Sequence, residues 1–186
     1  MNCLVWRTGT RCGDRYLLQS SLLALWRSLR HLDMSGNTIL GDAKAMPGFL
    51  GSLQSLTYLN LSYMDFQGRV PPQLGNPTKL VQLDIGWDSV LHTNIRKGIL
   101  HSKDISCLVR LRSLELLNMA FVDLSGVHDC FHMVNTLPNL AVLILVACCL
   151  NAPSSLLHNN FTSLDELDLS YNSFNTVATP NWFWNI

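Results

Sequence analysis

The chain has 186 residues, of which 48% are apolar and 14% are charged, and its formal net charge is zero. Such a composition indicates a folded protein with a buried core, and the lack of a basic surplus disfavours nucleic acid as a partner. Charged residues interrupt the first apolar run, so no secretory signal peptide is expected. The longest apolar run, residues 140–150, is about half as long as a membrane-spanning helix, so no span is expected either.

A leucine pattern recurs along most of the chain. The motif Leu-x-x-Leu-x-Leu is found six times, with successive starts 27, 24, 34, 26 and 24 residues apart. All intervals but the third fall in the range of about 20 to 29 residues that is typical of leucine-rich repeats. We therefore expect six coils, the third of them longer, that start near Leu29, Leu56, Leu80, Leu114, Leu140 and Leu164.

The motif has the two-residue period of an extended strand. In LTYLNLSY, Leu59 and Leu61 are expected to point into a core, while Tyr58, Asn60 and Ser62 point outward. One strand cannot bury its apolar side alone, whereas stacked copies form a continuous core. The predicted fold is therefore an α/β-type repeat solenoid, a right-handed coil with a parallel concave sheet.

The segment FQGRVPPQLGN that follows the second copy is more specific. It matches the return path x-x-G-x-I-P-x-x-L-G-N of plant-type leucine-rich repeats. Gly68 is expected to allow a positive φ or a close approach, Pro71 to fix an extended path, and Leu74 to reach into the core. From about residue 20 to residue 186 the chain resembles the plant receptor-like proteins, which are membrane-anchored leucine-rich repeat proteins related to disease-resistance receptors.

This resemblance implies a domain organisation. Residues 1–28 are expected to form a degraded amino-terminal cap, because CLVWRTGTRC is similar to the family's C-x-W-x-G-V-x-C, and the resemblance implies a disulfide between Cys3 and Cys12. Residues 29–186 then hold about six repeats, and no carboxy-terminal cap is expected. The chain is interpreted as an amino-terminal fragment of an ectodomain.

Side chains that face out of the sheet should stack in columns, because equivalent positions of successive coils lie about 5 Å apart. One column, which we call the polar column, contains Asp33, Asn60, Asp84, Asn118, Ile144 and Asp168. A second, the aromatic column, lies three residues further along each coil and contains Gly36, Tyr63, Trp87, Phe121, Ala147 and Tyr171.

The two columns suggest a binding face for a protein or a peptide. Repeat consensus alone explains most of the polar column, and packing over the turn is an equally good explanation of the aromatic one. Exposed tyrosine and tryptophan nevertheless anchor interfaces efficiently. The predicted ligand-binding residues are Tyr58, Tyr63, Trp87, Phe121, Tyr171, Asp33, Asp84, Asn118 and Asp168.

The sequence gives only weak indications of a metal site or a catalytic site. In VHDCFHM, His128, Cys130 and His132 are too closely spaced for the usual zinc sites, so packing and surface roles are favoured. The set of Cys107, His101 and Asp104 lies within one segment, with no spacing that would orient a nucleophile and a base. Since phosphate-loop and kinase motifs are also missing, we expect neither an enzyme nor a cofactor.

The extracellular setting that the resemblance implies makes two sequons relevant, at Asn60 and Asn160. The first interpretation of function is the ligand-recognition part of a receptor-like protein at the extracellular face of the plasma membrane. It would act in defence or development through a partner receptor kinase, because the family has no kinase of its own. Two alternatives stay open, namely a secreted inhibitor of a cell-wall-degrading enzyme, similar to polygalacturonase-inhibiting proteins, and an inactive remnant of a truncated gene.

Overall fold

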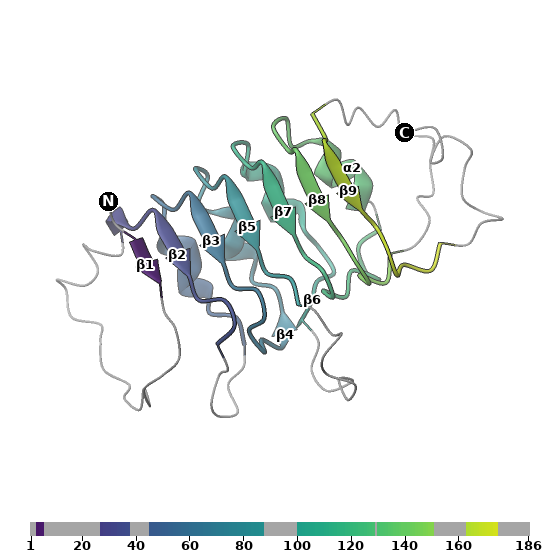
Figure 1. Ribbon diagram of the computed structural model, residues 1–186, viewed down its shortest axis with the longest axis horizontal. Helices are drawn as coiled ribbons and strands as arrows, with labels where there is room; N and C mark the ends of the chain where they lie inside the picture. The colour runs from purple at the N-terminus through teal and green to yellow at the C-terminus, as the bar shows by residue number, and fades with distance from the viewer. Residues whose placement is uncertain are drawn as a thin grey trace.

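A parallel sheet runs the length of the molecule (Figure 1). The computed structural model describes residues 3–5, 27–37, 45–87, 100–128, 130–150 and 163–174. Within these ranges seven short strands lie side by side, in the order β1 (Cys3–Val5), β2 (His31–Asp33), β3 (Tyr58–Asn60), β5 (Gln82–Asp84), β7 (Leu116–Asn118), β8 (Val142–Ile144) and β9 (Glu166–Asp168). The predicted parallel sheet of a leucine-rich repeat solenoid is confirmed.

All neighbouring strands pair in direct register. The central leucine of each motif pairs with the next along the sheet, as Leu59 does with Leu83 and Leu117 with Leu143. The first strand, β1, pairs its Cys3 with His31 of β2. No strand was predicted there, because Cys3–Val5 lacks the leucine motif, so its place in the sheet is a finding of the structure.

The core lies directly beneath the sheet. In the central coils the motif leucines are almost fully buried, with exposed fractions of 0% for Leu59, Leu83, Leu117 and Leu143. Each buried leucine side chain contributes roughly 2 kcal/mol of hydrophobic stabilisation. The regular spacing of the leucines in the sequence therefore accounts for one continuous core rather than separate clusters.

The predicted alternation of side chains holds only to the end of each strand. Ser62, which was predicted to face outward, is buried, and its hydroxyl donates a hydrogen bond to Oδ1 of Asn60 at 2.7 Å. The prediction for Ser62 was wrong because β3 ends at Asn60, and the two-residue period does not extend into the turn that follows.

Between β2 and β8, the return paths cover the other side of the core with short helices (Figure 1). Gly68 has a φ of +83°, Pro71 is extended and Leu74 is buried, which confirms the three roles predicted from FQGRVPPQLGN. The elements on this side are η1 (Gly48–Ser52), β4 (Gly68–Arg69), η2 (Pro72–Gly75), β6 (Leu100–His101), η4 (Ser106–Arg110) and α2 (Cys130–Asn135).

The return paths also contact one another closely. β4 and β6 form a second, two-stranded parallel sheet, in which Gly68 pairs with Leu100 and Arg69 with His101. A Cβ atom on Gly75 of η2 would clash with the backbone carbonyl of Cys107 in η4. Neighbouring coils are therefore joined on both sides, which gives the open face of the sheet, the face turned away from the core, a firm support.

Candidate ligand-binding groove

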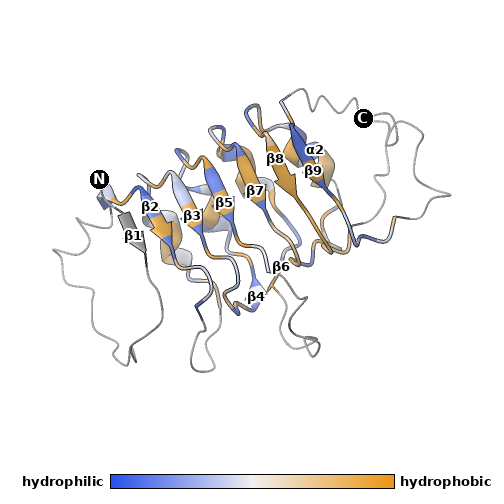
Figure 2. Ribbon diagram, in the orientation of Figure 1, coloured by the Kyte–Doolittle hydropathy of each residue, from blue (hydrophilic) through white to orange (hydrophobic). Residues whose placement is uncertain are grey.

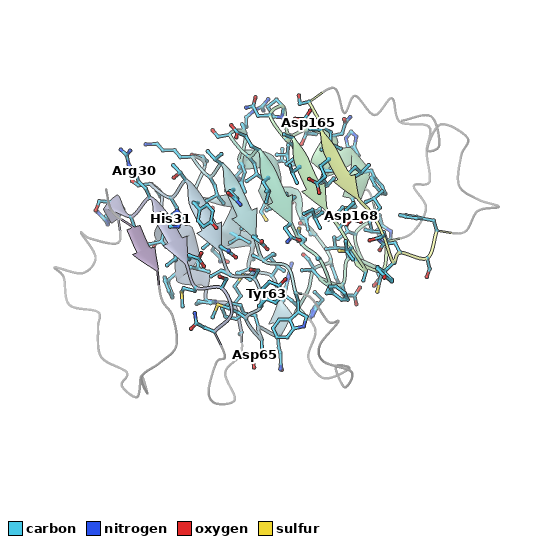
Figure 3. All side chains as sticks on the ribbon, viewed as in Figure 1. Arg30, His31, Tyr63, Asp65, Asp165 and Asp168 are labelled. Carbon is cyan, nitrogen blue, oxygen red and sulfur yellow. The ribbon has the colours of Figure 1, made fainter. Side chains whose placement is uncertain are left out.

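The aromatic column occupies a turn with an unusual backbone conformation. Tyr63, Phe121, Ala147 and Tyr171 all have positive φ values, between 52° and 63°, and Gly36 has a φ of +70° at the same position of the first coil. For a residue other than glycine this left-handed conformation costs on the order of 1 kcal/mol. The side chains of this column therefore stand beyond the ends of the strands, at the edge of the open face, where Figure 3 labels Tyr63.

Hydrogen bonds between coils hold this strained turn in place. The backbone N–H of Tyr63 donates to the carbonyl of Gly86 at 3.0 Å, that of Trp87 to Ala120 at 2.9 Å and that of Phe121 to Val146 at 2.8 Å. Each coil thus fixes the turn of the coil before it. Because the backbone is already ordered, a ligand that contacts these side chains meets a preorganised surface, and less entropy is lost on binding.

A shallow groove of about 280 Å³ runs along the column. Tyr63 and Tyr171 are 52% and 87% exposed, whereas the rings of Trp87 and Phe121 are half-buried. Tyrosine and tryptophan are the side chains that often anchor interfaces. The groove is lined by the aromatic side chains of four coils together with two members of the polar column, and these six are Tyr63, Trp87, Phe121, Tyr171, Asn118 and Asp168.

The polar column has a structural role. In β3, Oδ1 of Asn60 accepts the backbone N–H of Ser62, two residues on, at 3.0 Å. This bond, an Asx turn, satisfies a donor that the strand leaves unpaired. Every Asp and Asn of the column makes it, with distances of 2.9 to 3.0 Å at Asp33, Asn60, Asp84, Asn118 and Asp168.

Asp84 is a partly buried acid of that column. Burial raises the pKa of its carboxyl, an effect that hydrogen bonds from the Gly86 N–H and the Asn118 side chain partly offset. Gly86 has no side chain, and a Cβ there would lie 2.6 Å from Oδ1 of Asn118. Asp84, Gly86 and Asn118 therefore form one packed unit between β5 and β7, and Asp84 is held by its neighbours rather than presented to a ligand.

The predicted site residues thus divide into two groups. The groove brings together Tyr63, Trp87, Phe121, Tyr171, Asn118 and Asp168. Tyr58, Asp33 and Asp84 lie outside its lining, and the ring of Tyr58 stacks on His31 with centroids 3.9 Å apart. Binding by either group remains a prediction.

Sequence reasoning missed the small residues on which the groove rests. They stand immediately before the aromatic column, and Gly86, Ala120 and Val146 are among the lining residues. Their signal was present in the sequence, because the position is small or β-branched in every coil, where it reads Ser35, Ser62, Gly86, Ala120, Val146 and Ser170.

The two predicted glycosylation sites and the predicted disulfide are only partly covered by the residues that the structure describes. Asn60, a predicted glycosylation site, lies on the open face and its Nδ2 is 3.4 Å from the hydroxyl of Tyr58. Asn160 and Cys12 lie outside the described residues, and Cys3 is described only as backbone of β1. The second glycosylation site and the disulfide therefore stay predictions.

Burial affects the cysteines that were weighed for chemistry. Burial raises the pKa of the Cys107 thiol, and of the Cys130 thiol to about 12, which disfavours the nucleophilic thiolate. In the described part of the chain no three His, Cys, Asp or Glu side chains cluster as metal ligands. The same residues include no helix with the length and apolar character needed to cross a bilayer.

Comparisons with known proteins agree with this architecture. The Leucine Rich Repeat family model matches residues 28–53, 55–77 and 163–186. Receptor-like protein EIX1 of Solanum lycopersicum is 32% identical over 173 residues, which make up 91% of this chain and 15% of that protein. Receptor-like protein 32 of Arabidopsis thaliana is 30% identical over 169 residues, which make up 89% of this chain and 17% of that protein. The chain therefore spans less than a fifth of the length of these relatives.

Solved structures show the same fold. The leucine-rich repeat ectodomain of the Arabidopsis receptor kinase HAESA, in complex with an N-terminally extended IDA peptide hormone, matches 83% of this chain with a TM-score of 0.61 and 23% identity. The match covers 24% of the HAESA chain. At this level of identity the likeness establishes the solenoid architecture.

Proposed function

This chain belongs to the plant leucine-rich repeat receptor-like proteins, and on that premise we propose that it forms part of the ligand-recognition surface of a receptor ectodomain. The ligand is a peptide or an extended segment of a protein, and it lies across the strands in the groove along the aromatic column. The receptor acts at the extracellular face of the plasma membrane, in defence or developmental signalling, together with a partner receptor kinase.

The groove itself is the observation that carries this proposal. Four aromatic side chains from four coils line one depression. Tyr63, Phe121 and Tyr171 have a left-handed backbone, and the N–H groups of Tyr63, Trp87 and Phe121 donate hydrogen bonds to the next coil. Tyr63 and Tyr171 are both strained and exposed, so they contribute little to the core, and this favours a role in binding. The four coils are those of β3, β5, β7 and β9, which cover about 19 Å at a strand spacing of about 4.8 Å, the reach of roughly six extended residues.

The ligand class agrees with what is known of a structural neighbour. The HAESA ectodomain, which shares this fold, was solved with a peptide hormone ligand. An elongated, shallow groove suits an extended peptide better than a compact small molecule, which would leave most of its own surface in solvent.

The test uses the full chain and a display library of random dodecapeptides as the probe. Peptides enriched on the chain are synthesised, and their affinities are measured by calorimetry for the chain and for a Tyr63→Ala/Phe121→Ala double variant. We expect a loss of ~100-fold or more, because aromatic anchors of interfaces often contribute about 2 kcal/mol each.

Phe49→Ala is the matched control. Phe49 is 49% exposed, close to the value of Tyr63, but it lies in η1 on the return side. Affinities should be unchanged in this variant. Enriched peptides that bind the double variant as well as the parent chain would refute the proposal, provided that the circular dichroism spectra of the two proteins coincide.

A further inference from the structure

One member of the aromatic column is small, and it interrupts the row of rings. Ala147 stands between Phe121 and Tyr171 and shares their left-handed backbone conformation. Phe121 and Tyr171 are two coils apart, about 10 Å at the usual strand spacing. We call the gap left by this small side chain the Ala147 notch. At a spacing of about 10 Å, two rings that face each other leave room for one planar group between them.

The polar neighbour of the notch is acidic. Asp168 lines the groove in the same coil as Tyr171, and it is the only carboxylate among the described lining residues. Its Oδ1 accepts the N–H of Ser170 at 2.9 Å. A carboxylate has about four acceptor positions, so Asp168 keeps capacity for further donors.

The surface around the notch also carries negative charge. Asp165 and Glu166, at the start of β9, are both exposed, and Figure 2 shows β9 as hydrophilic beside the apolar β8. Figure 3 places Asp165 and Asp168 at this end of the sheet, and Arg30 and His31 near the opposite end. The β9 end of the open face therefore has a negative potential, which attracts and orients a cation.

We infer that the Ala147 notch takes the side chain of an arginine or lysine of the bound peptide. The cation lies between the faces of Phe121 and Tyr171 and donates hydrogen bonds to Asp168. Aromatic faces attract cations, and a guanidinium can also bind a carboxylate through two parallel hydrogen bonds. The half-buried Val146 and Ile144 beside the notch suit an apolar neighbour of that residue.

This inference rests on the proposed function, since it names the chemistry of one end of the same groove. Its first test is Asp168→Asn, which removes the charge and keeps an oxygen for the Ser170 N–H, as Asn60 and Asn118 do in their own coils. Peptides enriched from the dodecapeptide library should be richer in arginine and lysine than the unselected library. Their affinity for Asp168→Asn should fall ~10- to 100-fold, the usual effect of losing a charge-assisted hydrogen bond.

Asp123→Asn is the matched control. It makes the same chemical change, keeps an oxygen for the bond to the Ser125 N–H, and lies outside the groove lining. Affinities should be unchanged. A second variant, Ala147→Phe, fills the notch at a position where Phe121 shows that phenylalanine tolerates a positive φ. It should weaken the same peptides by a similar factor and leave the thermal unfolding midpoint within a few degrees.

The outcomes separate the two proposals. Peptides that lose affinity for the Tyr63→Ala/Phe121→Ala variant, yet carry no excess of basic residues and bind Asp168→Asn as well as the parent chain, overturn the inference and leave the proposed function standing. Replacing the arginine of an enriched peptide with citrulline should lower its affinity for the parent chain, and an unchanged affinity also overturns the inference. If enriched peptides bind the Tyr63→Ala/Phe121→Ala variant as well as the parent chain, both proposals fail.

Discussion

The polar column and the aromatic column lie three residues apart in every coil, yet their side chains are used differently. Asp33, Asn60 and Asp84 turn back on their own coil and accept backbone N–H groups two residues on. Tyr63 is held by the hydrogen bond of its backbone N–H to the carbonyl of Gly86, and the side chains of Tyr63 and Tyr171 are exposed to solvent. Both columns are periodic and both lie on the open face. The contrast teaches that repetition of a residue type does not by itself mark a binding function, because a structural task is repeated in every coil as well.

The largest effect on stability is expected at Asn118. Its Oδ1 accepts the N–H of Ala120 at 3.0 Å, and its side chain also bonds the carboxyl of Asp84. Asn118→Ala leaves both groups without that partner, which should lower the free energy of unfolding by about 1–3 kcal/mol. Urea denaturation followed by circular dichroism measures this change. Gln82→Ala, on the neighbouring β5, is the control and should stay within about 0.5 kcal/mol.

A smaller effect that depends on pH is expected at Asp84. Because burial raises the pKa of this carboxyl, the folded protein binds more protons than the unfolded chain between the unfolded and folded pKa values. The free energy of unfolding therefore falls as pH rises through that interval, and this loss of stability persists at neutral pH. Asp84→Asn should remove it, with a gain below about 1 kcal/mol after solvent screening.

Asp123 should give a pH dependence of stability with the opposite sign. A hydrogen bond from the Ser125 N–H lowers the pKa of its carboxyl, so its contribution to stability is present above the unfolded pKa and is lost as pH falls through the folded value. Urea unfolding midpoints are measured for the parent chain and both variants at several pH values from acidic to neutral. At neutral pH the midpoint of Asp84→Asn should lie above that of the parent chain, and the midpoint of Asp123→Asn should lie slightly below it. Equal changes in both variants would contradict the role assigned to burial of Asp84.

The smallest net effect is expected in the aromatic column. Tyr63→Gly removes a ring that is 52% exposed and relieves a positive φ of 57°, as Gly36 does naturally in the preceding coil. Stability should stay unchanged or rise by up to about 1 kcal/mol. Asn60→Ala, in the same coil, should lower it. A loss from Tyr63→Gly as large as that from Asn60→Ala would show that the two columns do not differ in the way described.

The fold was largely predictable from the spacing of residues. Leucines such as Leu59 and Leu83 predicted both strands and core because strand period and burial follow from local spacing. The return segment around Gly68 and Pro71 was equally predictable, because each residue restricts φ in a known way. β1 was not, since its pairing with β2 depends on a contact between distant segments and on no local motif.

The site was predictable only in outline. Matching equivalent positions in successive repeats placed Tyr63, Trp87 and Phe121 in one row, but it assumed that the strand continued past Asn60. The left-handed turn, which sets where the rings point, is a property of the hydrogen bonds between coils. The Asx bonds of the polar column were missed for the same reason, because Asp and Asn read as outward polar residues whether or not they are engaged.

The most direct test of the central claim is to locate a bound peptide on the surface. Library-selected dodecapeptides that carry a photoreactive phenylalanine are cross-linked to the full chain, and the attachment sites are mapped by mass spectrometry. The account predicts cross-links on the turns that hold Tyr63, Phe121 and Tyr171. Cross-links concentrated on η1 and η2 of the return side, with the aromatic turns unmodified, would contradict it.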